Sequence, residues 1–188
     1  MFGTVPTVPK SVEDYRPIVG DERIDELHHL ARSLVGVRVL NLTGLVLGTR
    51  MAEMLNAVVP IMGDLGLASD WEMIRSVAEF QQVNRQIRSA LSGDFIQWTA
   101  EMYETWLSYN VMNAELLDRQ YDVVVVNDLQ AVGLLAGAEA IGKRDLVERW
   151  IWHSHLDLSE AQPEVWTMVR PGVESYDAVL FDAAEFVP

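Results

Sequence analysis

A run of four valines at residues 123–126 constrains the fold of this chain more than any other feature. A strand with one face in solvent alternates polar and apolar side chains, whereas an unbroken β-branched run is typical of a strand inside a parallel sheet. We therefore predict that residues 121–126 form a central parallel strand that is covered on both faces. Parallel strands are joined by crossover segments, usually helices, so the rest of the chain should alternate between the two.

The remaining segments show this alternation. Helical spacing of apolar residues predicts helices near 21–36, 49–65, 77–91, 95–119, 130–141 and 161–169, and short apolar runs predict strands near 37–42, 69–74, 145–152 and 177–181. Residues 1–11 hold two of the seven prolines and should form an extended N-terminal arm. We expect one α/β domain over 12–188, a Rossmann-like, mostly parallel, doubly wound sheet flanked by helices.

Charge and composition exclude several classes of function. Asp and Glu number 28 against 14 Lys and Arg, and the net charge of −14 disfavours nucleic acid and membrane surfaces as partners. No apolar run approaches the roughly 20 residues of a membrane span. The chain has no cysteine, which excludes disulfides and thiolate metal sites. We expect a soluble, cytoplasmic protein.

The first candidate site is the turn before the helix predicted at 49–65. Gly48, Thr49 and Arg50 stand where such folds hold phosphate or sugar hydroxyls on backbone amides at a helix N-terminus. Val46 and Leu47 are large and apolar, which instead favours a buried or interface loop. The sequence leaves both interpretations open.

The second candidate site, Asn127-Asp128-Leu129-Gln130, follows the valine strand. Ligands of open α/β sheets bind at the carboxyl ends of the strands, so Asn127 and Gln130 are candidate binding residues. Asp128 could act as a general base or bind sugar hydroxyls. It could equally cap the following helix.

The third candidate site lies in residues 150–159, where an apolar aromatic strand runs into polar residues. If the backbone stays extended, His153, His155 and Asp157 project to the same side. Two imidazoles and one carboxylate resemble metal-ligand spacing, but a fourth ligand is missing, so we expect neither a metal nor any other cofactor. Asp157 could instead form a turn or helix cap, and His153 could be a core histidine.

Taken together, these segments resemble the first domain of the glycosyltransferring trehalose synthases, retaining enzymes that make trehalose from a nucleotide-glucose donor and glucose. The resemblance implies a Rossmann-like domain on the acceptor side of a two-domain cleft, with Asp128 and His155 as candidate catalytic residues. The second, donor-binding domain of that family has no counterpart in this chain. The matching segments keep the family's order and are 12–22, 51–55, 58–62, 65–67, 78–80, 127–130, 150–159, 164–166 and 185–188.

Departures from the family pattern concentrate at the functional loops. The family's triple-glycine turn appears as Gly48-Thr49-Arg50, its His-Asp-Pro-Gln as residues 127–130, and its Arg-Cys-His as residues 153–155. The change to threonine and arginine removes the close backbone approach that glycine permits. The resemblance therefore implies a degenerate domain.

Our leading hypothesis is a stand-alone binding or assembly module, non-catalytic by itself, that forms a homo-oligomer or docks on another protein. Its contact surface would include Val46, Leu47 and Leu129, because an exposed apolar patch needs a partner. Two alternatives stay open. The chain could be the acceptor-side half of a glycosyltransferase that needs a separate donor-binding domain, or it could hold a small apolar ligand in a pocket lined by these leucines and by tryptophans.

Overall fold

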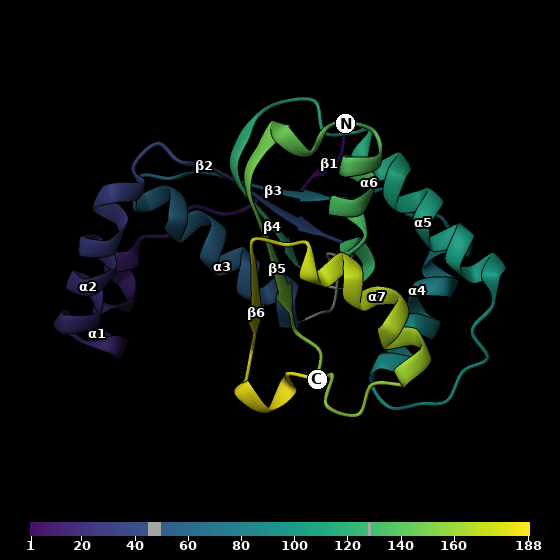
Figure 1. The fold of residues 1–188 in the computed structure, drawn as a ribbon. Coiled ribbons are helices and arrows are strands. Elements are labelled where there is room, and N and C mark those ends of the chain that lie inside the picture. The colour runs from purple at the N-terminus through teal and green to yellow at the C-terminus, as the bar shows by residue number, and fades with distance from the viewer. Residues whose placement is uncertain (45–49, 128) are drawn as a thin grey trace.

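A six-stranded sheet forms the centre of the domain in the computed structural model, which describes residues 1–44, 50–127 and 129–188 (Figure 1). The strand order is β1-β3-β2-β4-β5-β6. The strands β2 to β6 pair in parallel, and β1 pairs antiparallel to β3. Their bounds are β1 Gly3–Thr4, β2 Arg38–Thr43, β3 Ala68–Met73, β4 Tyr121–Asn127, β5 Val147–Ser154 and β6 Ala178–Phe181. The predicted α/β class and mostly parallel sheet are confirmed.

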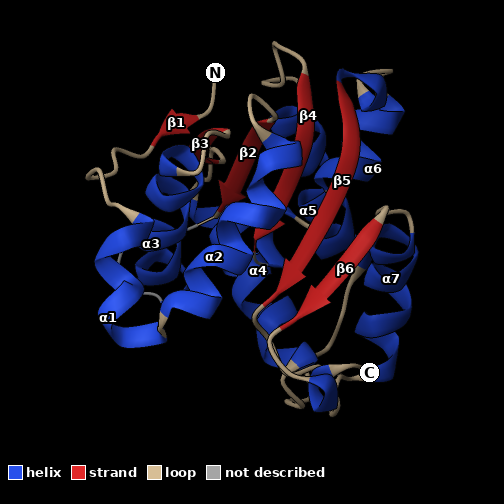
Figure 2. Ribbon diagram, turned by 90° about the vertical axis from the view of Figure 1, so that its left-hand side faces the viewer, coloured by secondary structure: helices blue, strands red, loops and turns tan. Residues whose placement is uncertain are grey.

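Helices lie on both faces of the sheet, but unevenly (Figures 1 and 2). The helix α3 packs Met51, Leu55 and Val59 against Trp71 on one face, while α4 to α7 contribute to the larger core on the other. The helices are α1 Arg16–Val19, α2 Asp21–Ala31, α3 Arg50–Asp64, α4 Ala78–Leu91, α5 Ala100–Ala114, α6 Leu134–Ala140 and α7 Pro163–Glu174. Among the described residues, no helix is both long and apolar enough to cross a membrane.

The valine strand β4 is central, as predicted, and pairs with β2 and β5. Val124 and Val126 are fully buried in the larger core, whereas Val123 and Val125 on the opposite face are only partly buried. The prediction that both faces are covered is therefore correct for one face only. The difference arises because the smaller cluster on that opposite face joins α3 to β3 rather than to β4.

Several predicted boundaries differ from the structure for local reasons. The helix predicted at 95–119 begins only after Thr99, whose side-chain oxygen accepts a hydrogen bond from the Met102 amide at 3.3 Å. The helix predicted at 130–141 divides into a 3-10 turn, Leu129–Ala131, and the short helix α6. The N-terminal arm does not stay unpaired, because Gly3 and Thr4 add an edge strand to β3.

The topology places one particular crevice at the carboxyl edge of the sheet. After β2 the chain builds β3 on one side and then crosses to place β4 on the other. The strand order thus reverses between β2 and β4, and adjacent crossovers leave from opposite faces at that point. In open α/β sheets, ligands bind at this switch point, outside the carboxyl ends of the two strands.

Candidate functional site

Three residues that follow β2 and β4 meet at the switch point. Gly44 comes directly after β2, Asn127 ends β4, and Gln130 lies in the 3-10 turn that follows. The side chain of Gln130 lies against Gly44 so closely that a Cβ built on Gly44 would be 2.6 Å from Gln130 Cδ and 2.7 Å from Gln130 Cβ. Only glycine fits at position 44 with Gln130 in this place.

Two acceptor oxygens are buried at this point without a hydrogen-bond donor among the described residues. They are Asn127 Oδ1 and Gln130 Oε1. Asn127 is 1% exposed and Gln130 is 7% exposed, and the Asn127 amide nitrogen donates to the Val125 carbonyl at 3.2 Å. A buried oxygen without a donor costs about 1–3 kcal/mol, so each of these two oxygens lacks a donor that the described residues do not supply.

A second polar group lies next to the first, at the ends of β5 and β6. Asn127 pairs with His153 in the register of β4 and β5, so the two groups are neighbours along the same sheet edge. His153 Nε2 lies 3.1 Å from Asp182 Oδ1, and His155 Nδ1 lies 3.1 Å from both Asp182 oxygens. The centroids of the two imidazole rings are 4.0 Å apart. The structure therefore brings both predicted histidines together around one carboxylate.

That carboxylate is Asp182 and not the expected Asp157. Asp157 accepts hydrogen bonds from the Ser159 amide at 3.0 Å and from its hydroxyl at 2.7 Å, which lower the Asp157 pKa. This local turn is the alternative that the sequence left open. Asp182 was missed because its closeness to the histidines depends on the pairing of β5 with β6, although an acidic residue directly after a predicted strand was a usable signal.

The environment of His153 favours its neutral form. Burial lowers the pKa of His153, and the neighbouring His155 lowers it further, while Asp182 opposes both effects. The second ring nitrogen of His155, Nε2, is buried and has no hydrogen-bond partner among the described residues.

Of the three apolar residues expected at an interface, Leu129 lies in the described part of the chain, and it is not exposed. Leu129 is 3% exposed and belongs to the main core, so the expectation that its side chain faces a partner is corrected: the 3-10 turn directs it inward. Val46 and Leu47 lie outside the described residues, as do Gly48, Thr49 and Asp128. Arg50 is exposed at the first residue of α3.

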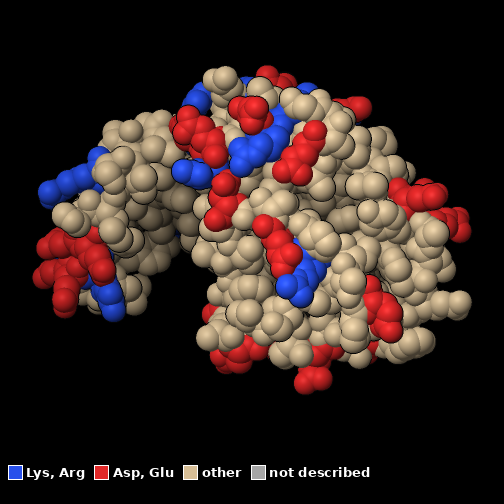
Figure 3. All heavy atoms as spheres, in the orientation of Figure 1, with Lys and Arg blue, Asp and Glu red and all other residues tan. Residues whose placement is uncertain are grey.

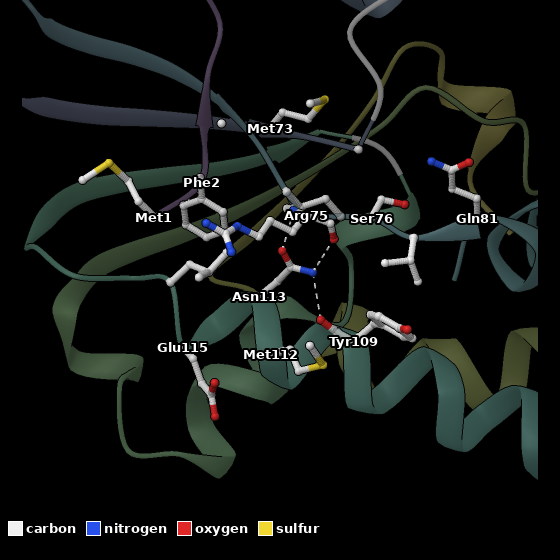
Figure 4. A pocket seen from close by; sticks show the side chains of 15 residues that line it. Met1, Phe2, Met73, Arg75, Ser76, Gln81, Tyr109, Met112, Asn113 and Glu115 are labelled. Atoms are coloured by element: carbon white, nitrogen blue, oxygen red, sulfur yellow. Dashed lines mark hydrogen bonds between the residues drawn. The ribbon is translucent and has the colours of Figure 1, made fainter. Parts of the chain in front are cut away.

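A cavity of about 710 Å³, lined in part by Gly44, lies between β1, the end of β3 and α5 (Figure 4). Its wall is held by Asn113, whose amide accepts from the Arg75 backbone nitrogen at 2.7 Å and donates to the Arg75 carbonyl at 2.9 Å. Met1, Met73 and Met112 line it, and its described lining residues include no tryptophan. Trp71, Trp106, Trp150 and Trp152 are buried, so the expected pocket of leucines and tryptophans is not the one found.

The surface charges of the domain are mixed rather than separated. Figure 3 shows basic side chains lying among acidic ones over the visible face. Arg38 pairs with Asp122 at 2.9 Å, and Arg144 and Arg149 both approach Asp177. These ion pairs lie at the amino ends of β2, β4, β5 and β6, at the opposite edge of the sheet from the candidate site.

Comparison with known proteins gives a consistent result. Residues 42–188 match the family model described as "Trehalose synthase, N-terminal domain". The trehalose synthase of Thermococcus litoralis is 35% identical over 180 residues, covering 95% of this chain and 42% of the relative, and that of Rubrobacter xylanophilus is 31% identical over 182 residues, covering 95% and 43%. The chain thus spans about two fifths of the length of these relatives.

Among solved structures, the α,α-trehalose 6-phosphate synthase of Burkholderia multivorans superposes with a TM-score of 0.56 at 14% identity. The match covers 80% of this chain and 41% of that one. At this identity the likeness supports the fold alone.

Proposed function

This chain belongs to the family of trehalose synthase N-terminal domains, and from that premise we propose that it is the acceptor-side domain of a retaining glycosyltransferase. In this proposal it binds a hexose acceptor such as glucose at the carboxyl edge of its sheet. Donor binding and bond formation would require a second domain, in keeping with the two fifths of each relative that this chain spans.

One observation carries this proposal: the buried, unpaired oxygens of Asn127 and Gln130 at the switch point. A hexose presents several hydroxyl groups, each of which can donate a hydrogen bond and accept others. Two such hydroxyls would satisfy the two oxygens and remove the cost of leaving them unpaired. The glycine at 44 supports this geometry, because it lets Gln130 lie over the end of β2.

The strand β5, next to β4, adds further polar side chains to the carboxyl edge of the sheet. His155 follows β5, whose residue His153 pairs with Asn127, so an imidazole lies one strand from the proposed sugar contacts. The roles expected for Asp128 and His155, holding acceptor hydroxyls or assisting proton transfer, stay predictions.

The first prediction concerns glucose affinity. Titrating the purified chain with glucose by calorimetry should give saturable binding, and Gln130→Ala should weaken it about tenfold, since one hydrogen bond to the sugar is worth about 1.4 kcal/mol. Gln82→Ala, on the exposed face of α4, removes the same side chain away from the site and should bind as the wild type does. The proposal would be refuted if the chain bound neither glucose nor related hexoses, or if Gln130→Ala and Gln82→Ala lowered the affinity equally.

The leading sequence hypothesis, a non-catalytic assembly module, stays a prediction. The residues named for its contact surface either lie outside the described part of the chain or, in the case of Leu129, are buried. An assay that mixes the chain with a donor-binding domain, nucleotide-glucose and glucose distinguishes an acceptor-side domain from a non-catalytic assembly module. Formation of a disaccharide, lost in His155→Ala, is the result expected of an acceptor-side domain.

A further inference from the structure

Two imidazoles and a carboxylate converge where β5 and β6 end. One ligand atom from each of His153, His155 and Asp182 lies within 4.8 Å of the other two. His153 lies in β5, and His155 and Asp182 directly follow the paired residues Ser154 and Phe181 at the ends of β5 and β6. The cluster does not include Asn127 or Gln130, although it shares His155 with the proposed acceptor site.

We propose that His153, His155 and Asp182 bind a divalent transition-metal ion of the zinc type. Nitrogen and oxygen ligands without a thiolate suit Zn²⁺, Co²⁺ and Ni²⁺. The site lies one strand away from Asn127 and Gln130, so it can exist whether or not the chain binds a sugar.

The distances in the cluster are close to those that an ion requires. Three donors about 2.1 Å from one tetrahedral ion lie about 3.4 Å from one another. The two nitrogen-to-oxygen separations here are both 3.1 Å. The two nitrogen-to-oxygen pairs would each have to open by about 0.3 Å to reach this spacing, and the two nitrogens lie within 4.8 Å of each other.

The exposure of the three residues also fits metal binding. The side chains of His153 and His155 are 20% and 17% exposed, and that of Asp182 is 43% exposed. The open side at Asp182 gives an ion a way in and leaves room for a water molecule as the fourth ligand.

The test is a metal titration of untagged protein stripped with a chelator. Co²⁺ should bind at one ion per chain and give the visible absorption bands of a low-coordinate nitrogen and oxygen site, and Zn²⁺ should displace it. Asp182→Asn keeps the size of the side chain but removes a charged ligand, and His155→Ala removes an imidazole. Each should weaken Co²⁺ binding at least tenfold. Zn²⁺ should also raise the thermal unfolding midpoint of the wild type, because an ion that binds only the folded state stabilises it.

The chain supplies its own control. Its other two histidines, His28 and His29, lie on α2, and His28 contacts Glu13. A His28→Ala and His29→Ala double variant should keep the Co²⁺ spectrum, the affinity and the effect of Zn²⁺ on unfolding. The proposal is overturned if this double variant abolishes binding, if folded Asp182→Asn and His155→Ala bind as the wild type does, or if the wild type shows no Co²⁺ spectrum.

Discussion

A Gly44→Ala variant is expected to lose glucose binding, with affinity reduced well beyond the tenfold predicted for Gln130→Ala. The new methyl group would lie 2.7 Å from Gln130 Cβ, which is the base of that side chain and cannot swing away freely. Either the Gln130 side chain or the backbone after β2 must move. Asn127 Oδ1 and Gln130 Oε1 would then no longer be positioned to bind the same sugar. Overpacking of this kind also lowers the free energy of unfolding by about 1–3 kcal/mol. Calorimetry with glucose and urea unfolding measure the two effects.

A matched control for this change is Gly63→Ala in α3. A Cβ built on Gly63 meets nothing within 4 Å, and alanine is the better residue inside a helix. This variant should be up to about 1 kcal/mol more stable than the wild type and should bind glucose unchanged. If Gly44→Ala binds glucose as tightly as Gly63→Ala does, Gln130 does not hold the sugar in the way proposed.

Replacing Trp150 with alanine is expected to cause the larger loss of stability, about 3–5 kcal/mol in the free energy of unfolding. Trp150 is fully buried, its ring packs edge-on against Tyr176 at 6.5 Å, and its Nε1 donates to the Arg144 carbonyl at 3.3 Å. The change would leave a cavity between β5 and the helices that cover it. Because β5 also carries the histidines, the cavity should loosen the carboxyl edge of the sheet.

The comparison for this prediction is Trp166→Ala, at a partly buried position on α7 that packs at the border of the same core. It removes an equal volume where solvent and neighbouring side chains can fill the space, so its cost should be clearly smaller. Urea unfolding of both variants under one condition gives the ranking. An equal loss in the two would show that Trp150 is not the central packing residue that its burial indicates.

The fold could be predicted largely because its strongest signals are local. The valine run identified β4 as the centre of the sheet, since such a sequence is typical of a strand inside a parallel sheet. The alternation of apolar runs and helical spacing then gave the order of the elements. The uneven cover of the sheet was missed, because whether a helix packs over a given strand depends on crossover geometry and not on the strand's own residues.

The candidate site could be predicted only in part, for the same physical reason. Asn127, Gln130 and the two histidines were found, since each follows a predicted strand. That His153 and His155 cluster with Asp182 and not with Asp157 could not be predicted, because it depends on the pairing of β5 with β6. This pairing brings together His155 and Asp182, which are 27 residues apart in the sequence. Leu129 was expected on the surface because the tight turn after β4, which directs it into the core, has no distinct sequence pattern.

The most direct test of the proposed hexose site is to locate bound glucose on the domain by nuclear magnetic resonance. In a titration of ¹⁵N-labelled chain with glucose, we expect the side-chain amide signals of Asn127 and Gln130 to shift most, with the Gln130 signal identified by its absence in Gln130→Ala. Amides around Arg75 and Asn113, at the methionine-lined cavity, should stay in place. Shifts centred on that cavity, or none at the carboxyl ends of β2 and β4, would contradict the proposed hexose site.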